Sequence, residues 1–321
     1  MIHKTPWLGY LNLAFAQTVI GVNAVIGKYL ADKVPLFTFI CSRFFIGSVI
    51  LLVAFKLSKA DIIVKPTKAP KLSKTEWRWL VAQALTGGLL FNFLFFEGLC
   101  FTTASSAGII ASTLPAMIAI CAWFFLKESL STRKILAIGF AIMGIGIINL
   151  DNSSVSALGA VAEQGSFLGD GLILLAMFPE ALFSIFGRLL GKRVQPLASA
   201  AIVTTICFLS TLPFGVYDLL TQVDYGLSPF NIGLIVLSGA STVIFYYCCN
   251  KGLAVVEAGI SAVFGSLFPV SATILAWLFL DERLSWYDFT GMIVILISIV
   301  IGAELRRVGR NKLGSIEDVR P

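Results

Sequence analysis

The chain has 321 residues, of which 57% are hydrophobic and only 13% are charged, and its formal net charge is +6. A soluble chain carries about twice this share of charged residues, so the composition argues against a soluble protein and predicts one embedded in lipid. The positive charge has a simple source in a membrane protein, because lysine and arginine gather on the cytoplasmic side. Nucleic-acid binding is therefore not expected.

Long apolar runs recur along the whole chain. A helix that crosses a bilayer needs about 20 mostly apolar residues. The runs therefore predict an all-α integral membrane protein with about ten transmembrane helices, in contact with the lipid bilayer. The expected spans are 7–30, 35–55, 77–98, 102–125, 133–150, 169–191, 196–218, 229–251, 257–280 and 286–304. The first span is longer than a signal-peptide core and is expected to stay uncleaved.

One stretch of the fourth span returns in the ninth. Both copies hold a proline, then a tryptophan, then a glutamate, and the step from Pro115 to Glu128 equals the step from Pro269 to Glu282. Between 98–131 and 252–285, 13 of 34 paired positions are identical without a gap. Such self-similarity indicates duplication. The predicted organisation is a first repeat over 1–150, a loop over 151–168, a second repeat over 169–304 and a cytoplasmic tail over 305–321.

Each repeat has about five spans, which is an odd number, so the second repeat enters the membrane upside down. The expected fold is thus two inverted five-helix repeats. About 20 of the 24 basic residues fall on the side of the N-terminus, which places both termini in the cytoplasm. The expected location is the inner or plasma membrane. Inverted repeats are typical of secondary transporters, whose solute site lies between the repeats near the midplane.

The doubled block ends in Leu126-Lys127-Glu128-Ser129-Leu130-Ser131 and in Leu280-Asp281-Glu282-Arg283-Leu284-Ser285. With the opening Gly21–Lys28 stretch and Ser42-Arg43-Phe44, it resembles the EamA-like family of the drug/metabolite transporter superfamily. The resemblance covers the chain to about residue 304. It implies ten helices, a central cavity surrounded by spans one, three, four, six, eight and nine, and carriage of small metabolites, often outward.

Polar groups inside the spans are the main candidates for a site, because a charge at the centre of a bilayer is costly. Glu180 follows Pro179 in the sixth span, where it could take up a proton near neutral pH or form an internal salt bridge. Arg43 and Glu97 are expected to pair, as a static clamp or as a gate. Further side chains that could contact substrate or line a cavity are Asn23, Asn92, Tyr246, Tyr247, Asn250, Phe183 and Trp123.

The doubled prolines Pro115 and Pro269 are expected to kink their helices. The kinks could serve as hinges at a cavity wall or belong to a close packing face of small residues. Glu128 and Glu282 end their spans, and a structural role at the following turn is the expectation for both. Lys251 occupies the repeat position of Glu97, so the two halves differ in charge.

These observations predict a secondary active transporter that exports a small organic metabolite or drug-like solute by alternating access, with coupling to protons as one option. Uptake or exchange by the same fold stays open, as does a different class, a lipid scramblase or pore. No P-loop and no catalytic set of Ser/His/Asp or Cys/His is evident, so an enzyme is not expected. The six cysteines and the single His3 lack metal spacing, so no metal or cofactor is predicted. The protein could act as a monomer or a homodimer.

Overall fold

The computed structural model describes residues 6–30, 33–59, 61–63, 72–101, 110, 113–128, 131–156, 167–191, 193–221, 228–279 and 285–302. Within these segments almost all of the chain is helical. An isolated antiparallel bridge joins Ile63 to Val194, and the described part of the chain contains no strand. The prediction of an all-α protein is confirmed.

The helices of the first half are α1 (Pro6–Leu30), α2 (Leu36–Ser58), α3 (Lys74–Ala84), the π-helical turn η1 (Leu85–Leu90), α4 (Phe91–Phe101), α6 (Leu114–Leu126) and α7 (Thr132–Ser156). Those of the second half are α8 (Phe167–Leu190), α9 (Pro196–Thr221), α10 (Pro229–Leu253), α11 (Ala258–Gly265), α12 (Leu267–Phe279) and α13 (Trp286–Gly302). The elements α3, η1 and α4 follow one another without a gap, as one helical run.

Six helical stretches of the described chain are long and apolar enough to cross a membrane. They are Trp7–Gly27, Leu36–Ser58, Leu168–Leu190, Pro196–Thr221, Pro229–Leu253 and Ala258–Phe279. Two shorter apolar helices, Leu114–Leu126 and Trp286–Ile301, accompany them. A multi-pass membrane protein is therefore confirmed, because every backbone polar group in lipid needs an internal partner and helices supply it. The number ten stays a prediction.

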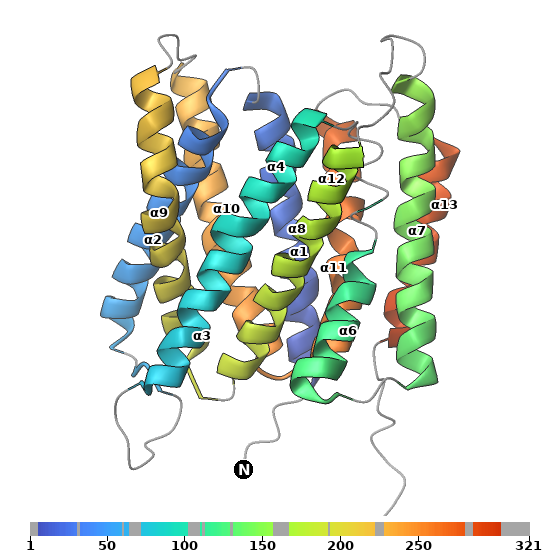
Figure 1. The fold of residues 1–321 in the computed structure, drawn as a ribbon, viewed down its shortest axis with the longest axis horizontal. Coiled ribbons are helices and arrows are strands. Elements are labelled where there is room, and N and C mark those ends of the chain that lie inside the picture. The colour runs from blue at the N-terminus through green and yellow to red at the C-terminus, as the bar shows by residue number, and fades with distance from the viewer. Residues whose placement is uncertain are drawn as a thin grey trace, which may run out of the picture.

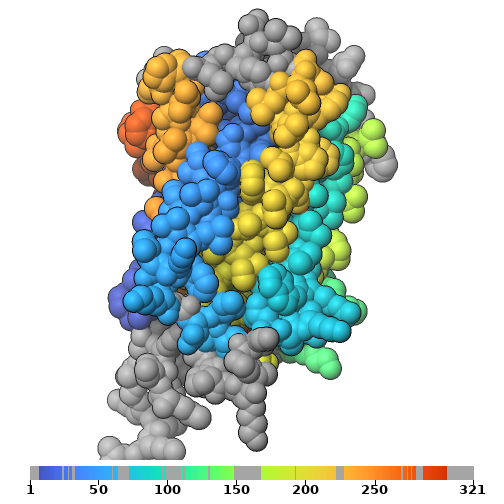
Figure 2. All heavy atoms as spheres, turned by 90° about the vertical axis from the view of Figure 1, so that its left-hand side faces the viewer, coloured from blue at the N-terminus to red at the C-terminus, as the bar shows by residue number. Residues whose placement is uncertain are grey.

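The helices stand side by side in one bundle (Figure 1). The pair α7 and α13 forms one side of the bundle, and the pair α2 and α9 forms the other. Figure 2 shows this second side, where α9 lies between α2 and the run of α3 and α4. The largest apolar core lies inside, where α1, α2, α9 and α10 bury residues such as Leu13, Phe44, Val203 and Leu253.

Local sequence signals fix several helix ends. Ser73 accepts a hydrogen bond from the Glu76 amide at 3.2 Å, and the Glu76 carboxylate accepts one from the Ser73 amide at 2.7 Å. This reciprocal pair is a capping box and starts α3. Ser228 caps α10 through the Asn231 amide at 3.2 Å, with Pro229 in the first turn.

The end of α6 lies beside the start of α11. Glu128 Oε1 accepts a hydrogen bond from the Ala258 amide at 3.1 Å, and Glu128 Oε2 accepts one from the Gly259 amide at 3.2 Å. Glu128 closes one copy of the doubled block, whereas α11 opens the span that contains the other copy. The end of one copy meets the start of the other, which indicates that the two copies run in opposite directions.

Candidate functional site

Arg43 of α2 is the cation of a polar cluster inside the bundle. Its Nη2 donates to Asn92 Oδ1 at 3.4 Å. Its Nε is buried and has no hydrogen-bond partner within the described segments. The guanidinium carbon lies 5.1 Å from the centre of the Phe44 ring and 5.9 Å from that of Phe39, so two aromatic faces stabilise the cation. No described carboxylate pairs with this guanidinium.

Asn92 holds the π-helical turn η1 in place. Its Nδ2 donates to the carbonyl oxygen of Gly88 at 2.7 Å and to that of Gly87 at 3.2 Å. A π-helical turn is wider than an α-helical one and is frequent at functional sites. The Asn92 side chain therefore serves as an acceptor toward Arg43 and as a donor toward the widened turn.

Glycine is required in η1 because α8 and α9 approach it closely. A Cβ atom added at Gly88 would lie 2.3 Å from Cys207 Sγ, and one added at Gly87 would lie 2.5 Å from Phe183 Cδ2. Both positions therefore bring the η1 backbone against side chains of the second half. Cys207 Sγ also donates to the Ala84 carbonyl oxygen at 3.6 Å, one turn before.

Tyr246 of α10 is the aromatic centre of the cluster and is only 4% exposed. Its hydroxyl oxygen lies 3.8 Å from Cys207 Sγ. Its ring packs edge-on against Phe183 and Phe44, with ring centroids 5.8 Å and 6.1 Å away. Edge-to-face packing at these distances is favourable, so aromatic rings from α2, α8 and α10 meet at Tyr246.

Glu180 of α8 brings a carboxyl group to the same place. It precedes Phe183 by one helical turn, and the Phe183 ring packs against Tyr246. Within the described residues no basic side chain forms an ion pair with it, so the internal salt bridge considered for Glu180 is not formed there. Pro179, inside α8, has no N–H to donate to the preceding turn, which loosens the helix next to this carboxyl. We call Arg43, Asn92, Glu180, Cys207 and Tyr246 the central cluster.

A second polar group, which we call the amide cluster, lies one turn along α10. Gln83 Nε2 donates to Asn250 Oδ1 at 3.2 Å, and Ser199 Oγ donates to the same oxygen at 3.4 Å. Asn250 Nδ2 in turn donates to the Tyr246 carbonyl oxygen at 2.8 Å. Gln83 Oε1 is buried without a hydrogen-bond partner in the described chain. The amide cluster thus continues the central cluster across α3, α9 and α10.

Asn23 belongs to a separate group that joins α1 to α10. Its Oδ1 accepts from Ser238 Oγ at 2.6 Å and from Ser241 Oγ at 2.7 Å, and its Nδ2 donates to Thr242 Oγ1 at 3.3 Å. These hydrogen bonds occupy both ends of the amide. In this structure Asn23 therefore acts as a tie between the two helices rather than presenting a free amide.

Most of the chain matches one family of transporters. The sequence profile of the EamA-like transporter family matches twice, over residues 7–150 and 167–302. The chain belongs to the EamA-like transporter family. The uncharacterized transporter YetK of Bacillus subtilis is 32% identical over 298 residues, with 91% of this chain and 86% of YetK covered.

More distant relatives agree with this membership. An uncharacterized transporter of Methanothermobacter thermautotrophicus is 22% identical over 91% of this chain and 85% of the relative. A solved crystal structure superposes with a TM-score of 0.70 at 17% identity and covers 92% of this chain and 94% of the other. That likeness shows a shared fold.

In this EamA-like transporter Arg43 does not pair with Glu97. The hydrogen bond of Arg43 goes to Asn92, and Glu97 forms no ion pair with it. The physical reason is position, because Asn92 already reaches the guanidinium while Glu97 lies more than a turn further along α4. The expected pair of Arg43 and Glu97, as a clamp or a gate, is therefore not formed in this conformation. Tyr247, next to the central cluster, instead lies with its ring 5.4 Å from the Nζ of the exposed Lys251.

The doubled prolines of the family block stand at helix starts. Pro115 is the second residue of α6. Pro269 is the third residue of α12, just after the break between α11 and α12 at Ser266. Proline fits the first turn of a helix because its missing N–H would have no intrahelical partner there. Near Pro269 the span is interrupted, because α11 ends at Gly265 and α12 begins at Leu267.

Charged side chains around Glu128 connect the two repeats. Arg188 Nη1 donates to the Leu253 carbonyl oxygen at 3.1 Å, and Arg188 Nε lies 3.9 Å from Glu128 Oε1. Lys134 Nζ of α7 forms an ion pair with Glu257, the residue before α11. The structure gives Glu128 a structural role, but as an N-terminal cap of α11 in the second repeat and not at the turn that follows Glu128. Glu282 lies outside the described residues.

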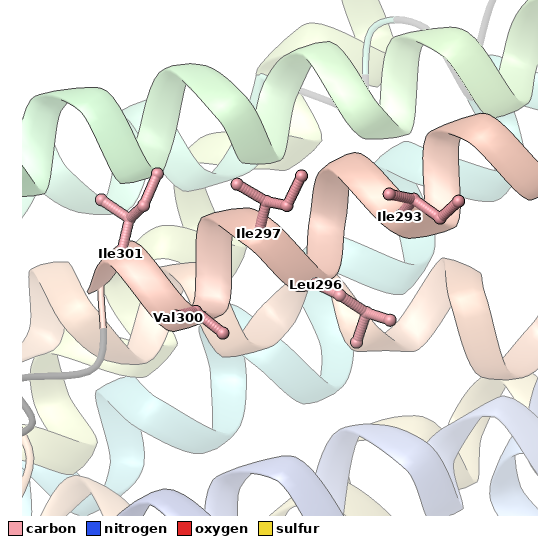
Figure 3. Close-up of a pocket in the computed structure, with 5 residues that line it drawn as sticks. All are labelled: Ile293, Leu296, Ile297, Val300 and Ile301. Carbon is pink, nitrogen blue, oxygen red and sulfur yellow. The ribbon is translucent and has the colours of Figure 1, made fainter.

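An apolar groove on α13 differs from the central cluster in the side chains that line it. Only aliphatic side chains line it, from Ile293, Leu296, Ile297, Val300 and Ile301. Figure 3 shows Ile297 and Ile301 pointing towards α7, while Leu296 and Val300 point away from it. Such a groove suits hydrocarbon and offers nothing to orient a polar solute. The central cluster is therefore the better candidate site of this transporter.

Proposed function

We propose that this chain is a secondary transporter that exports a small organic solute by alternating access of its two repeats. The observation that carries the proposal is the composition of the central cluster. Arg43 and Asn92 come from the first repeat, and Glu180, Cys207 and Tyr246 come from the second. A buried site shared by two inverted halves is the arrangement that lets one half rock against the other around a bound solute.

Glu180 is the proposed coupling residue. It is a carboxyl group inside a membrane helix, with no basic partner among the described residues, and it lies one turn before Phe183, whose ring packs against Tyr246. A carboxyl group in this setting can bind and release a proton as the site changes its exposure. Proton exchange at Glu180 would then accompany solute movement. EamA-like transporters are generally carriers rather than enzymes, and the proposed role includes no covalent chemistry.

The proposed location is the inner or plasma membrane with both termini in the cytoplasm. The excess of basic residues on the side of the N-terminus supports this orientation. Reporter fusions at each end would test it: a reporter that is active only outside the cytoplasm should be silent at both termini. Activity of that reporter at either terminus would overturn the orientation.

Counterflow in liposomes tests the transport proposal. Purified protein, reconstituted with an unlabelled solute inside, should accumulate the labelled solute transiently above its outside concentration, because a carrier exchanges solute. A pore or scramblase gives no such overshoot. The Glu180→Gln variant should keep exchange but lose the response to an imposed proton gradient. The exposed Asp61→Asn variant serves as the matched control and should behave like the parent. No counterflow with any solute of a broad metabolite panel would refute the proposal.

A further inference from the structure

We propose that the transported solute is a small organic monocarboxylate whose carboxylate group pairs with Arg43. This inference rests on the proposed transport function and names the class of solute at the same site. It starts from the environment of Arg43, whose only hydrogen bond within the described chain goes to a neutral amide oxygen at 3.4 Å. The Nε atom is buried and has no hydrogen-bond partner among the residues that the structure describes.

An anion is the most favourable partner for a guanidinium in this position. It presents five N–H donors in a planar fork, and a carboxylate matches two of them at once. Cation–π contacts with Phe44 and Phe39 stabilise the charge but fill none of the donors. Burying a cation without a counter-charge is unfavourable, so a bound carboxylate supplies the partner that the described chain does not.

The charge balance of the central cluster limits the solute to one negative charge. Arg43 is the only cation among the five members of the central cluster, and one guanidinium balances one negative charge. A phosphate or dicarboxylate would bring a second negative charge to a cluster with a single guanidinium. Phosphate sites usually add helix N-termini or further basic groups, and no helix begins at Arg43, Glu180, Cys207 or Tyr246. A monocarboxylate therefore fits best.

The rest of the solute should be apolar. Rings of Phe44, Phe183 and Tyr246 meet at the cluster, with centroid separations of 5.8 Å and 6.1 Å around Tyr246. The Tyr246 hydroxyl and Cys207 Sγ face one another at 3.8 Å. A solute with a carboxylate at one end and a hydrocarbon or aromatic body would satisfy both parts of the site.

Binding to matched solutes tests this assignment. The full-length protein in detergent would be measured against monocarboxylates from propanoate to 3-phenylpropanoate, each compared with its amide and its amine. At least one acid is expected to bind tenfold or more tightly than its amide, with the amine weaker still. Arg43→Lys should weaken acid binding about tenfold, because an ammonium lacks the planar fork. Arg43→Gln should abolish the preference for acid over amide, whereas the exposed Arg78→Gln should not change it.

Folding and function are separated by two further readouts. Thermal unfolding and gel filtration show whether an Arg43 variant is intact, and Arg43→Lys covers the case in which Arg43→Gln does not fold. Equal binding of every acid and its amide would overturn the inference, as would a folded Arg43→Gln that keeps the acid preference. Counterflow of neutral or cationic solutes without any acid preference would overturn the inference and leave the transport proposal standing. Absence of counterflow for all solutes would instead refute the transport proposal.

Discussion

Removal of the Glu128 carboxylate should destabilise the protein by about 2–3 kcal/mol. The carboxylate accepts two backbone hydrogen bonds at the start of α11, at 3.1 Å and 3.2 Å. Loss of an N-terminal cap costs about 0.5–2 kcal/mol, and a charge at a partly buried helix N-terminus contributes up to about 2 kcal/mol. The Glu128 side chain is only 14% exposed, so water screens the interaction weakly. Glu128→Ala loses both terms.

Conservative variants sharpen this prediction. Glu128→Gln keeps one acceptor oxygen and should lose only about 1 kcal/mol, the net contribution of one ordinary hydrogen bond. Glu128→Asp is shorter by one methylene and should resemble Glu128→Ala. The free energy of unfolding would be measured in mixed micelles by titration with a denaturing detergent, followed by circular dichroism. The exposed Asp61→Asn is the control and should change little. Loss of an N-terminal cap costs at least about 0.5 kcal/mol. A Glu128→Ala variant whose free energy of unfolding differs from that of the parent by less than this would refute the reasoning.

Three further outcomes are expected. Gly88→Ala should destabilise the protein by about 1–3 kcal/mol, because the new Cβ overlaps Cys207 Sγ and overpacking strains a core; Cys207→Ala in the same chain should restore most of the loss in a detergent unfolding titration. Asn23→Ala should cost about 1–2 kcal/mol, because it removes interhelical hydrogen bonds to α10, and an unchanged unfolding midpoint would contradict this. Glu180→Gln should make exchange in liposomes insensitive to pH, whereas a pH profile like that of the parent would exclude Glu180 as the coupling group.

The membrane-spanning helices could be predicted from the sequence because a bilayer requires little more than a long apolar segment. An apolar run of about 20 residues is sufficient, and α2 and α10 end within three residues of the expected limits. The π-helical turn Leu85–Leu90 was not predictable in this way. It depends on contacts with Asn92, Phe183 and Cys207, and the last two lie far away in the sequence.

The site was predictable by residue type but not by pairing. Arg43, Asn92, Glu180 and Tyr246 were all candidates, because polar groups in apolar spans are conspicuous. Their partners were not evident, since a single sequence carries no distance between residues in different helices. Cys207 and Gln83 were missed for a related reason. Gln83 meets Asn250 across 167 positions of sequence, and cysteine in an apolar run is an ordinary core residue.

The cap formed by Glu128 also means that neither repeat is complete by itself. A protein ending near residue 150 would carry the carboxylate without the helix start that it holds, and the second repeat alone would have uncapped amides at Ala258 and Gly259. In a single-repeat ancestor the same contact would join two copies inserted in opposite orientations. The duplication then converts an intermolecular bond into an intramolecular one, with no new chemistry required.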